Sequence, residues 1–351
     1  MFPIFLFTMI SCSTSEFQYE FPSSHKNIEE HIEDTGHDTS NPISSYAFQP
    51  LEQSNIFGAG IWNGLAPFDE HEFFFSTMAT KDLTLRKLST EDLHVTSSII
   101  TIADLDDIDE GDHITDHAIL RVEDTLYFVF STNNLDDMYL LSTDLEGNRI
   151  SLVMAQENGV HPTQDPHLFT DNERICARWG SDGFEKKVHC RSLDLTEIRL
   201  DKVVTTPAPI PKLGATLWHN DEFWTFTGDA PQRNLIYSRY DRDFIPLTNP
   251  FETIVLTSQY NEWNWFCSGV LYIEDYDLWV IAYIHMEANQ EADIDGRGRL
   301  DLFDGDFNLL DRHFFGTTAT YRPHLLFVDP YLYMGYDHEY VSVEKIKIIS
   351  E

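Results

Sequence analysis

The sequence predicts an all-β protein whose main domain is a single β-propeller, with six blades favoured and five as the alternative. Two observations support this prediction. A unit of short strands recurs about every 50 residues, and almost no segment shows the apolar period of a helix. Of the 351 residues, 42% are hydrophobic and 13% aromatic, which is enough for a packed core. We therefore expect one folded domain over residues 51–351, preceded by two segments without a core.

The first segment has the composition of an export signal. Met1–Ile10 is almost wholly apolar but shorter than the about 20 residues of a membrane helix, which favours a signal peptide over residues 1–11. The run Met9-Ile10-Ser11-Cys12 resembles the lipobox of bacterial lipoproteins. This resemblance implies that Cys12 becomes a lipidated N-terminus and, with Ser13 after it, that the protein is sorted to the outer membrane. We expect an exported, cell-envelope protein held at a membrane by its lipid anchor. The alternative is a buried strand with a chance cysteine.

The second segment, residues 12–50, is predicted to be a flexible acidic linker. Over residues 13–50 it carries seven acidic side chains against Lys26 alone, and Ser, Thr and Asn fill much of the rest. Such a stretch buries too little apolar surface to offset its ordering entropy.

The charge of the whole chain limits its partners. With 59 acidic and 23 basic residues, the formal net charge is −36. A field of this sign repels the phosphates that supply most nucleic-acid affinity, so nucleic acid is excluded as a partner. The same field argues against a polyanionic glycan and favours a neutral sugar or a cationic partner.

The repeat defines the predicted blades. Each copy opens with a short strand, turns, and continues into an aromatic-rich second strand, as in Asp116–Leu120 followed by Leu126–Phe130. The openings fall near residues 63, 116, 165, 214, 268 and 322, at steps of 53, 49, 49, 54 and 54. A third strand closed by an Asp-containing turn, as at Asp144, and a fourth apolar segment follow, which is typical of propeller blades. The last copy lacks a clear fourth strand, so we expect a strand near Ser45–Leu51 to close the ring.

Two cysteines are predicted to form a disulfide, in keeping with export. Cys176 and Cys190 flank a turn at Ser181-Asp182-Gly183, and mirror pairing about residue 183 places them opposite each other on adjacent strands. A disulfide is feasible there if their Cβ atoms come close in a non-hydrogen-bonded pair.

Residues that open the innermost strands converge at the mouth of a propeller's central channel, although they lie about fifty residues apart. Convergent polar and aromatic groups in a concavity are the default binding-site hypothesis, and Trp faces stack on sugar rings. The alternative is that the Asp side chains cap turns and the His side chains bond backbone. The candidate ligand-binding residues are Trp62, Asn63, His117, His167, Trp263, Trp265, Arg322 and His324, together with the carboxylates of Asp116 and Asp165.

Two openings carry a resemblance to a known family. Asp165-Pro166-His167-Leu168-Phe169 and, less closely, Asp116–Leu120 resemble openings in arabinanase- and xylosidase-type glycoside hydrolases, which are five-bladed propellers. This resemblance implies that Asp116 is a general base and that Asp165 modulates the acid, with Glu262 as the nearest candidate acid. The family's acid is a Glu that opens a later blade, where this chain has Phe266–Gly269.

We therefore favour a propeller that binds a neutral glycan without cleaving it. A glycoside hydrolase is the alternative, and a protein-interaction scaffold without a small-ligand site is the second alternative. We expect a monomer whose partner is a glycan or an envelope protein.

One local motif predicts a cation. The segment from Asp293 to Leu302 resembles the calcium loops of integrin-type propeller repeats, and this resemblance implies Ca²⁺ ligands at Asp293, Asp295 and Asp301. A solvated Asp-Gly hairpin is the alternative.

Overall fold

The structure, a computed structural model, places the propeller within the unit Ser44–Glu351. It describes residues 46–58, 63–79, 82–97, 100–102, 114–132, 137–157, 165–180, 183–210, 214–228, 234–248, 254–256, 262–287, 297–316, 321–337 and 340–350. The apolar segment, the lipobox-like run with Cys12 and most of the predicted linker lie outside these residues. Within them, no helix is both long and apolar enough to cross a membrane.

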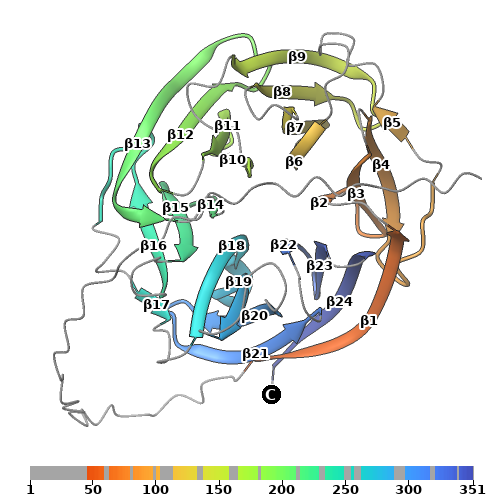
Figure 1. The fold of residues 1–351 in the computed structure, drawn as a ribbon. Coiled ribbons are helices and arrows are strands. Elements are labelled where there is room, and N and C mark those ends of the chain that lie inside the picture. The colour runs from red at the N-terminus through yellow and green to blue at the C-terminus, as the bar shows by residue number, and fades with distance from the viewer. Residues whose placement is uncertain are drawn as a thin grey trace, which may run out of the picture. The chain divides into compact units, whose positions relative to one another are not determined.

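The fold consists of six antiparallel sheets of four strands each, arranged as blades around a centre (Figure 1). Blade 1 is β2 (Asn63–Pro67), β3 (Glu72–Ala79), β4 (Asp82–Ser89) and β5 (Ile100–Ile102). Blade 2 is β6 (Ile114–Val122), β7 (Thr125–Thr132), β8 (Met138–Thr143) and β9 (Arg149–Gln156). Blade 3 is β10 (His167–Thr170), β11 (Arg174–Trp179), β12 (Gly183–Ser192) and β13 (Ile198–Ile210).

The other three blades follow the same order from the innermost strand outward. Blade 4 is β14 (Ala215–His219), β15 (Glu222–Gly228), β16 (Leu235–Tyr240) and β17 (Ile254–Leu256). Blade 5 is β18 (Glu262–Ile273), β19 (Leu278–Glu287), β20 (Arg297–Asp304) and β21 (Leu309–Phe315), with the short 3₁₀ helix η2 (Glu274–Tyr276) between β18 and β19. Blade 6 is β22 (Tyr321–Val328), β23 (Tyr331–Asp337), β24 (Tyr340–Ser350) and β1 (Tyr46–Gly58). Six blades are confirmed, and the five-bladed alternative is wrong.

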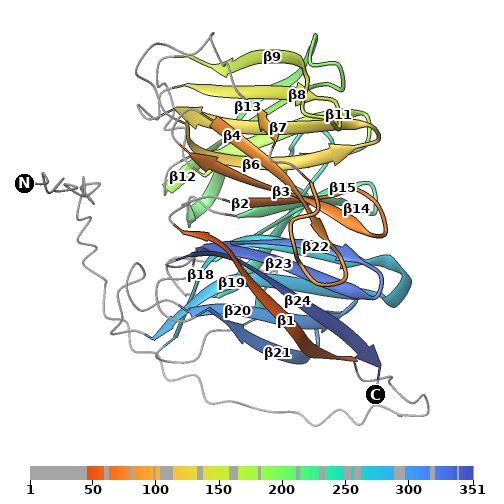
Figure 2. The same cartoon turned by 90° about the vertical axis from the view of Figure 1, so that its right-hand side faces the viewer.

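The ring closes through the sixth blade. β1 pairs antiparallel with β24, from Tyr46 opposite Ser350 to Gly58 opposite Tyr340, and Figure 2 shows the two strands side by side. The innermost strands contact one another in the order β2, β6, β10, β14, β18, β22 and back to β2. The closing strand expected near Ser45–Leu51 is therefore present. It begins at Tyr46, within the last residues of the segment 12–50.

Three of the turns between third and fourth strands share one geometry around an Asp side chain. Asp144 Oδ1 accepts hydrogen bonds from the backbone N–H groups two and four residues later, at 3.0 and 2.7 Å. Asp241 repeats this arrangement at 2.9 and 2.8 Å, and Asp304 at 3.0 and 2.8 Å. An Asx turn of this kind satisfies backbone donors that have no strand partner.

These turns also join each blade to the one before it. Leu195 and Phe244 adopt left-handed backbone conformations with φ of 60° and 53°, which is unfavourable for residues other than glycine. Each side chain is buried in a cluster formed with the preceding blade, Leu195 among residues of blades 2 and 3 and Phe244 among residues of blades 3 and 4. Burial of a Leu or Phe side chain contributes about 1.5–3 kcal/mol, which is enough to offset the backbone strain.

Candidate functional site

The innermost strands lie around the centre of the ring (Figure 1). Because every blade repeats the same strand order, they all run the same way and their first residues gather at one end of the ring. At this end lie Asn63 and His167, the first residues of β2 and β10, and Asp116 and His324, near the starts of β6 and β22. The arrangement brings polar residues from four blades to this end of the ring.

The two candidate catalytic carboxylates are close together but buried. Asp116 and Asp165 are 3% and 4% exposed. The carboxylate of Asp116, in blade 2, accepts a 2.6 Å hydrogen bond from the backbone N–H of Asp165, which precedes β10 of blade 3. Asp165 has a left-handed backbone with φ of 48°. Asp116 therefore joins two blades by holding a strained backbone position.

His117 joins blade 2 to blade 1. Its Nε2 lies 2.9 Å from the Ser76 hydroxyl, and that hydroxyl donates to the carbonyl of Gly64 at 3.3 Å. Because a serine hydroxyl has only one proton to give, Nε2–H of His117 donates to Ser76 Oγ. Both side chains are buried.

His167 joins blade 3 to blade 4. Its Nε2 lies 3.1 Å from the carbonyl oxygen of Thr216. The pKa of His167 is lowered from 6.5 to about 3, mainly by burial and in addition by the positive charges of Arg178 and His324. The imidazole is therefore neutral at physiological pH and donates Nε2–H to Thr216.

Three residues from the openings of blades 2 and 3 thus tie neighbouring blades together, Asp116 and His167 through backbone groups and His117 through a serine hydroxyl. These polar side chains hold neighbouring blades together.

For several predicted residues the structure describes either nothing or the backbone alone. Trp62, Asp293 and Asp295 lie outside the described residues. The backbones of Glu262, Trp263 and Trp265 belong to β18 and that of Arg322 to β22, but their side chains are outside the description.

The carboxylate of Asp301, the remaining candidate calcium ligand, accepts hydrogen bonds from three other side chains. Arg312 donates to both of its carboxylate oxygens, at 2.8 and 3.0 Å. Arg299 adds a hydrogen bond of 3.2 Å and the Tyr283 hydroxyl one of 2.8 Å. Two guanidinium groups around one carboxylate repel a divalent cation, so Asp301 does not fit a calcium site. Among the described residues no cluster of His, Cys, Asp and Glu is arranged to hold a metal.

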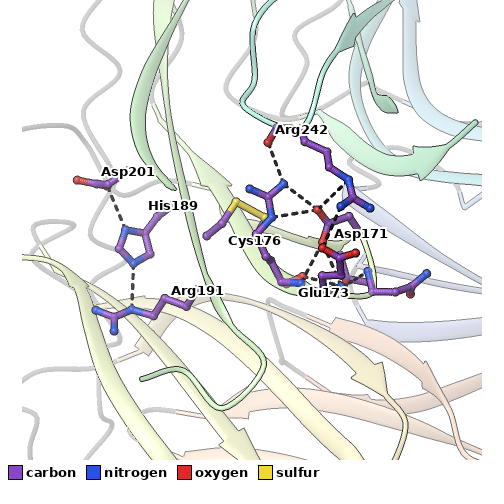
Figure 3. Close-up of a disulfide and its surroundings, with 11 residues drawn as sticks. Asp171, Glu173, Cys176, His189, Arg191, Asp201 and Arg242 are labelled. Carbon is purple, nitrogen blue, oxygen red and sulfur yellow. Dashed lines mark hydrogen bonds and ion pairs between the residues drawn. A yellow bond between two sulfur atoms is a disulfide. The ribbon is translucent and has the colours of Figure 1, made fainter. Parts of the chain in front are cut away.

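Cys176 and Cys190 form a disulfide across β11 and β12, with an S–S distance of 2.09 Å (Figure 3). Their Cα atoms are 4.0 Å apart, close to the spacing of a non-hydrogen-bonded pair. The bridge is buried in the core that also receives Phe244.

Blade 3 also carries an Asp–His pair. His189 Nδ1 lies 3.0 Å from Asp201, and the Nε of Arg191 donates to His189 Nε2 at 3.0 Å (Figure 3). Burial lowers the pKa of His189, which keeps the imidazole neutral. Since Arg191 already occupies Nε2, His189 has no free lone pair with which to act as a general base.

The sequence interpretation missed Arg178 and Lys186, two buried cations of blade 3. Arg178 lies directly across from His167 in the register of β10 and β11. The one signal for it is that Arg178 is the only charged residue in the apolar run Ile175–Trp179.

Comparison with known proteins supports the architecture. No family model and no curated protein matches the sequence. The solved structure of a DUF4221-family member from Bacteroides vulgatus aligns over 88% of this chain and 99% of its own, at 10% identity and a TM-score of 0.51. Trypanosoma rangeli sialidase aligns over 86% of this chain and 57% of its own, at 9% identity and a TM-score of 0.54.

A GH43_1 enzyme from Xanthomonas citri, solved with xylose, aligns over 68% of this chain and 84% of its own. Its identity is 10% and its TM-score 0.45, a value that carries no inference. Together, the two higher-scoring alignments show that the chain shares the propeller fold.

Proposed function

We propose that this protein is a glycan-binding propeller that takes a neutral sugar at the channel mouth where the innermost strands begin. The observation that carries the proposal is the gathering of Asn63, Asp116, His167 and His324, from four blades, at that one end. A protein that shares this fold is a sialidase, and at 9% identity its alignment shows the fold alone.

Binding is favoured over hydrolysis by the surroundings of the two aspartates. A glycosidase needs two carboxyl groups that flank the scissile bond, roughly 5–9.5 Å apart, with access for sugar and water. One carboxylate oxygen of Asp116 instead accepts a hydrogen bond from the backbone N–H of Asp165. Both aspartates are almost fully buried. In this arrangement they shape the mouth and do not attack a substrate.

The charge and the aromatic residues define the ligand class. The net charge of −36 disfavours binding of an acidic polysaccharide, whereas the electrostatic field does not repel an uncharged sugar. Trp263 and Trp265 lie in the first residues of β18, at the same end of the ring as the other openings. In our proposal their faces stack on sugar rings, the usual way in which proteins hold uncharged carbohydrate.

The lipobox-like run at Met9–Cys12 supports a place for this binding protein at the cell envelope. A lipid anchor at Cys12 would keep the propeller at a membrane surface while the acidic segment after it acts as a tether.

A glycan array followed by calorimetric titration tests the proposal. We expect wild-type protein to bind at least one neutral oligosaccharide and Trp265→Ala to weaken this binding at least tenfold. Phe314→Ala is the matched control, because Phe314 is an exposed aromatic residue on the outermost strand of the same blade and should leave binding unchanged. Absence of binding to every neutral glycan, or equal binding by Trp265→Ala and wild type, refutes the proposal.

The same preparations distinguish the hydrolase. If wild-type protein releases reducing sugar and Asp116→Asn does not, the protein is a glycoside hydrolase and the binding proposal is wrong. We expect no release, and we expect Asp116→Asn to keep its affinity because an amide oxygen still accepts the N–H of Asp165.

A further inference from the structure

The outermost strand of a propeller blade has one edge without a neighbour in its own sheet, and such an edge can accept a strand from another chain. β9 (Arg149–Gln156) is the outermost strand of blade 2 and lies at the rim of the ring (Figure 1). Among the described strands it pairs only with β8. No described strand therefore covers the outer edge of β9.

β9 lacks the side chains that usually protect such an edge. Natural edge strands are kept from pairing by short length, by charged residues or by proline. β9 has eight residues, and after Arg149 its sequence Ile-Ser-Leu-Val-Met-Ala-Gln contains no charge and no proline. Its pairing with β8 is irregular near both ends and regular over Ser151–Met154. The strand is thus uncharged over most of its length in a chain in which 23% of the residues are charged.

The outermost strands of the other five blades are protected. β5 and β17 are only three residues long. β1, β13 and β21 are longer, and each carries charged residues, with proline as well in β1 and β13. These protecting residues are Pro50 and Glu52 in β1, Arg199, Asp201, Lys202, Pro207 and Pro209 in β13, and Asp311 and Arg312 in β21. Among the six outermost strands that the structure describes, β9 alone is both long and unprotected.

β9 also exposes apolar side chains. Ile150 is 61% exposed and Met154 is 40% exposed. Leu152, which lies between them, is partly buried and packs against the core shared by blades 1 and 2. Burial of apolar surface is favourable, so a strand added at this edge would gain free energy by covering Ile150 and Met154.

The charges at the two ends of β9 favour a second copy of the same chain as the added strand. Arg149 begins the strand and Glu157 follows it, and both are exposed. In an antiparallel pair of two β9 strands centred on Val153, Arg149 of each copy lies opposite Glu157 of the other. Opposite charges across a strand pair are stabilising, whereas a parallel pair would set like charges side by side. β9 is therefore complementary to itself in the antiparallel direction.

We propose that the chain forms a two-fold symmetric dimer in which the two β9 strands pair antiparallel and join the blade 2 sheets of both copies. Such an interface uses the same surface on both partners, so assembly stops at two copies. The dimer replaces the monomer that the sequence analysis expects. It is independent of the glycan proposal, because β9 lies at the rim of the ring and the strand openings lie around its centre.

Sedimentation velocity of the full chain tests the dimer. The protein is measured from about 1 to 100 µM, a range that reveals a micromolar dissociation constant. The salt concentration is about 0.15 M, at which the Debye length is about 8 Å and the repulsion between two chains of net charge −36 is screened. We expect monomer to convert to dimer as the concentration rises. A monomer over the whole range, or growth beyond the dimer, overturns the proposal.

Reversal of the end charges tests the direction of the strand pair. Arg149→Glu and Glu157→Arg each set like charges opposite one another at both ends, so each variant alone should dimerise at least tenfold more weakly than wild type. Glu157→Arg lowers the net negative charge, so a general repulsion between copies would instead make it associate more strongly. An equimolar mixture of the two variants restores both opposite-charge pairs and should form a dimer with about wild-type affinity. A mixture that associates no more tightly than either variant alone refutes the antiparallel pair.

A charge placed within the strand assigns the dimer to β9. Ile150→Lys supplies the edge protection that β9 lacks and should weaken dimerisation at least tenfold. Ile198→Lys is the matched control, because Ile198 is 58% exposed on β13, the outermost strand of the next blade, and should leave the dimer unchanged. Both positions are exposed, so both variants should fold, which far-UV circular dichroism checks. A dimer that persists in Ile150→Lys, or that is lost equally in Ile198→Lys, contradicts the proposal.

Discussion

Phe244 tests whether the turn residues that pack between neighbouring blades hold the ring together. Its side chain is 1% exposed, in a left-handed turn of blade 4, and packs in the cluster shared by blades 3 and 4. Its ring centroid lies 4.7 Å from that of Phe223, 5.4 Å from that of Tyr240 and 5.6 Å from that of Phe169. Phe244→Ala removes all of these contacts and leaves a cavity between two blades.

The expected loss is large. Truncation of a buried Phe to Ala costs about 3–5 kcal/mol, the sum of the lost transfer free energy and the cavity. Phe244→Leu should cost at most about 1.5 kcal/mol, because Leu fills most of the volume and already occupies the equivalent position at Leu195. Phe244→Gly deletes the same ring but relieves the left-handed strain, so it should be about 1 kcal/mol more stable than Phe244→Ala.

Equilibrium urea unfolding, followed by far-UV circular dichroism and tryptophan fluorescence, measures these differences. Ile245→Ala is the control, because Ile245 is the next residue in the same turn but is 52% exposed, and its truncation should change stability by no more than about 0.5 kcal/mol. The reasoning is refuted if Phe244→Ala lies within about 1 kcal/mol of Ile245→Ala.

Three further predictions follow from contacts in blades 2 and 3. Reduction of the disulfide between Cys176 and Cys190, 14 residues apart, should lower the unfolding free energy by about 3 kcal/mol in a urea titration with and without reductant. Asp116→Ala should cost about 1–3 kcal/mol in thermal or urea unfolding, because the buried N–H of Asp165 loses its acceptor. His167 takes up a proton below about pH 6.5 when unfolded but only near pH 3 when folded, so the unfolded state binds more protons between these values. Stability should therefore fall as the pH decreases through this window, by at most about 1.4 kcal/mol per pH unit, and His167→Gln should remove that part of the slope.

Each of these predictions has a control. Replacement of both bridged cysteines by serine should abolish the response to reductant, and a response that persists contradicts the disulfide assignment. Asp116→Asn should be close to wild type, since its amide oxygen still accepts, and a loss equal to that of Asp116→Ala would show that the charge and not the hydrogen bond stabilises. For the pH dependence, wild type is compared with His167→Gln under the same conditions, and a slope that persists in the variant would place its origin elsewhere.

The blade count and the strand order follow from information that is local in the chain. Successive strands of a blade are joined by short turns, so that β3 and β4 are only two residues apart. Each hairpin therefore leaves its own pattern of apolar alternation and turn residues. The disulfide is local in the same sense, because Cys176 and Cys190 pair across one hairpin whose centre can be read from its turn.

The role of the channel-mouth residues could not be obtained in this way. Asp116 was a candidate base because of its place at a strand opening, but its hydrogen-bond partner is the backbone of Asp165, 49 residues further on in the next blade. Arg178 sits in an apolar strand, and strand alternation tells which face of a sheet a side chain occupies but not what covers that face. Only the packing of blade 4 against blade 3 encloses it with Lys186.

By itself, the sequence determined that this chain is a β-propeller closed by an N-terminal strand, with six blades favoured over five, that one hairpin can be bridged by cysteines and that the chain carries a strong negative charge. Tertiary structure alone decided that the opening residues tie blades together, that the carboxylate of Asp301 is enclosed by arginines, and that two cations of blade 3 are buried. The physical reason is the range of the interactions. Strand pairing in a blade is set by neighbours a few residues away, whereas burial, pKa and hydrogen-bond partners at the mouth are set by blades about fifty residues apart that meet only when the ring closes.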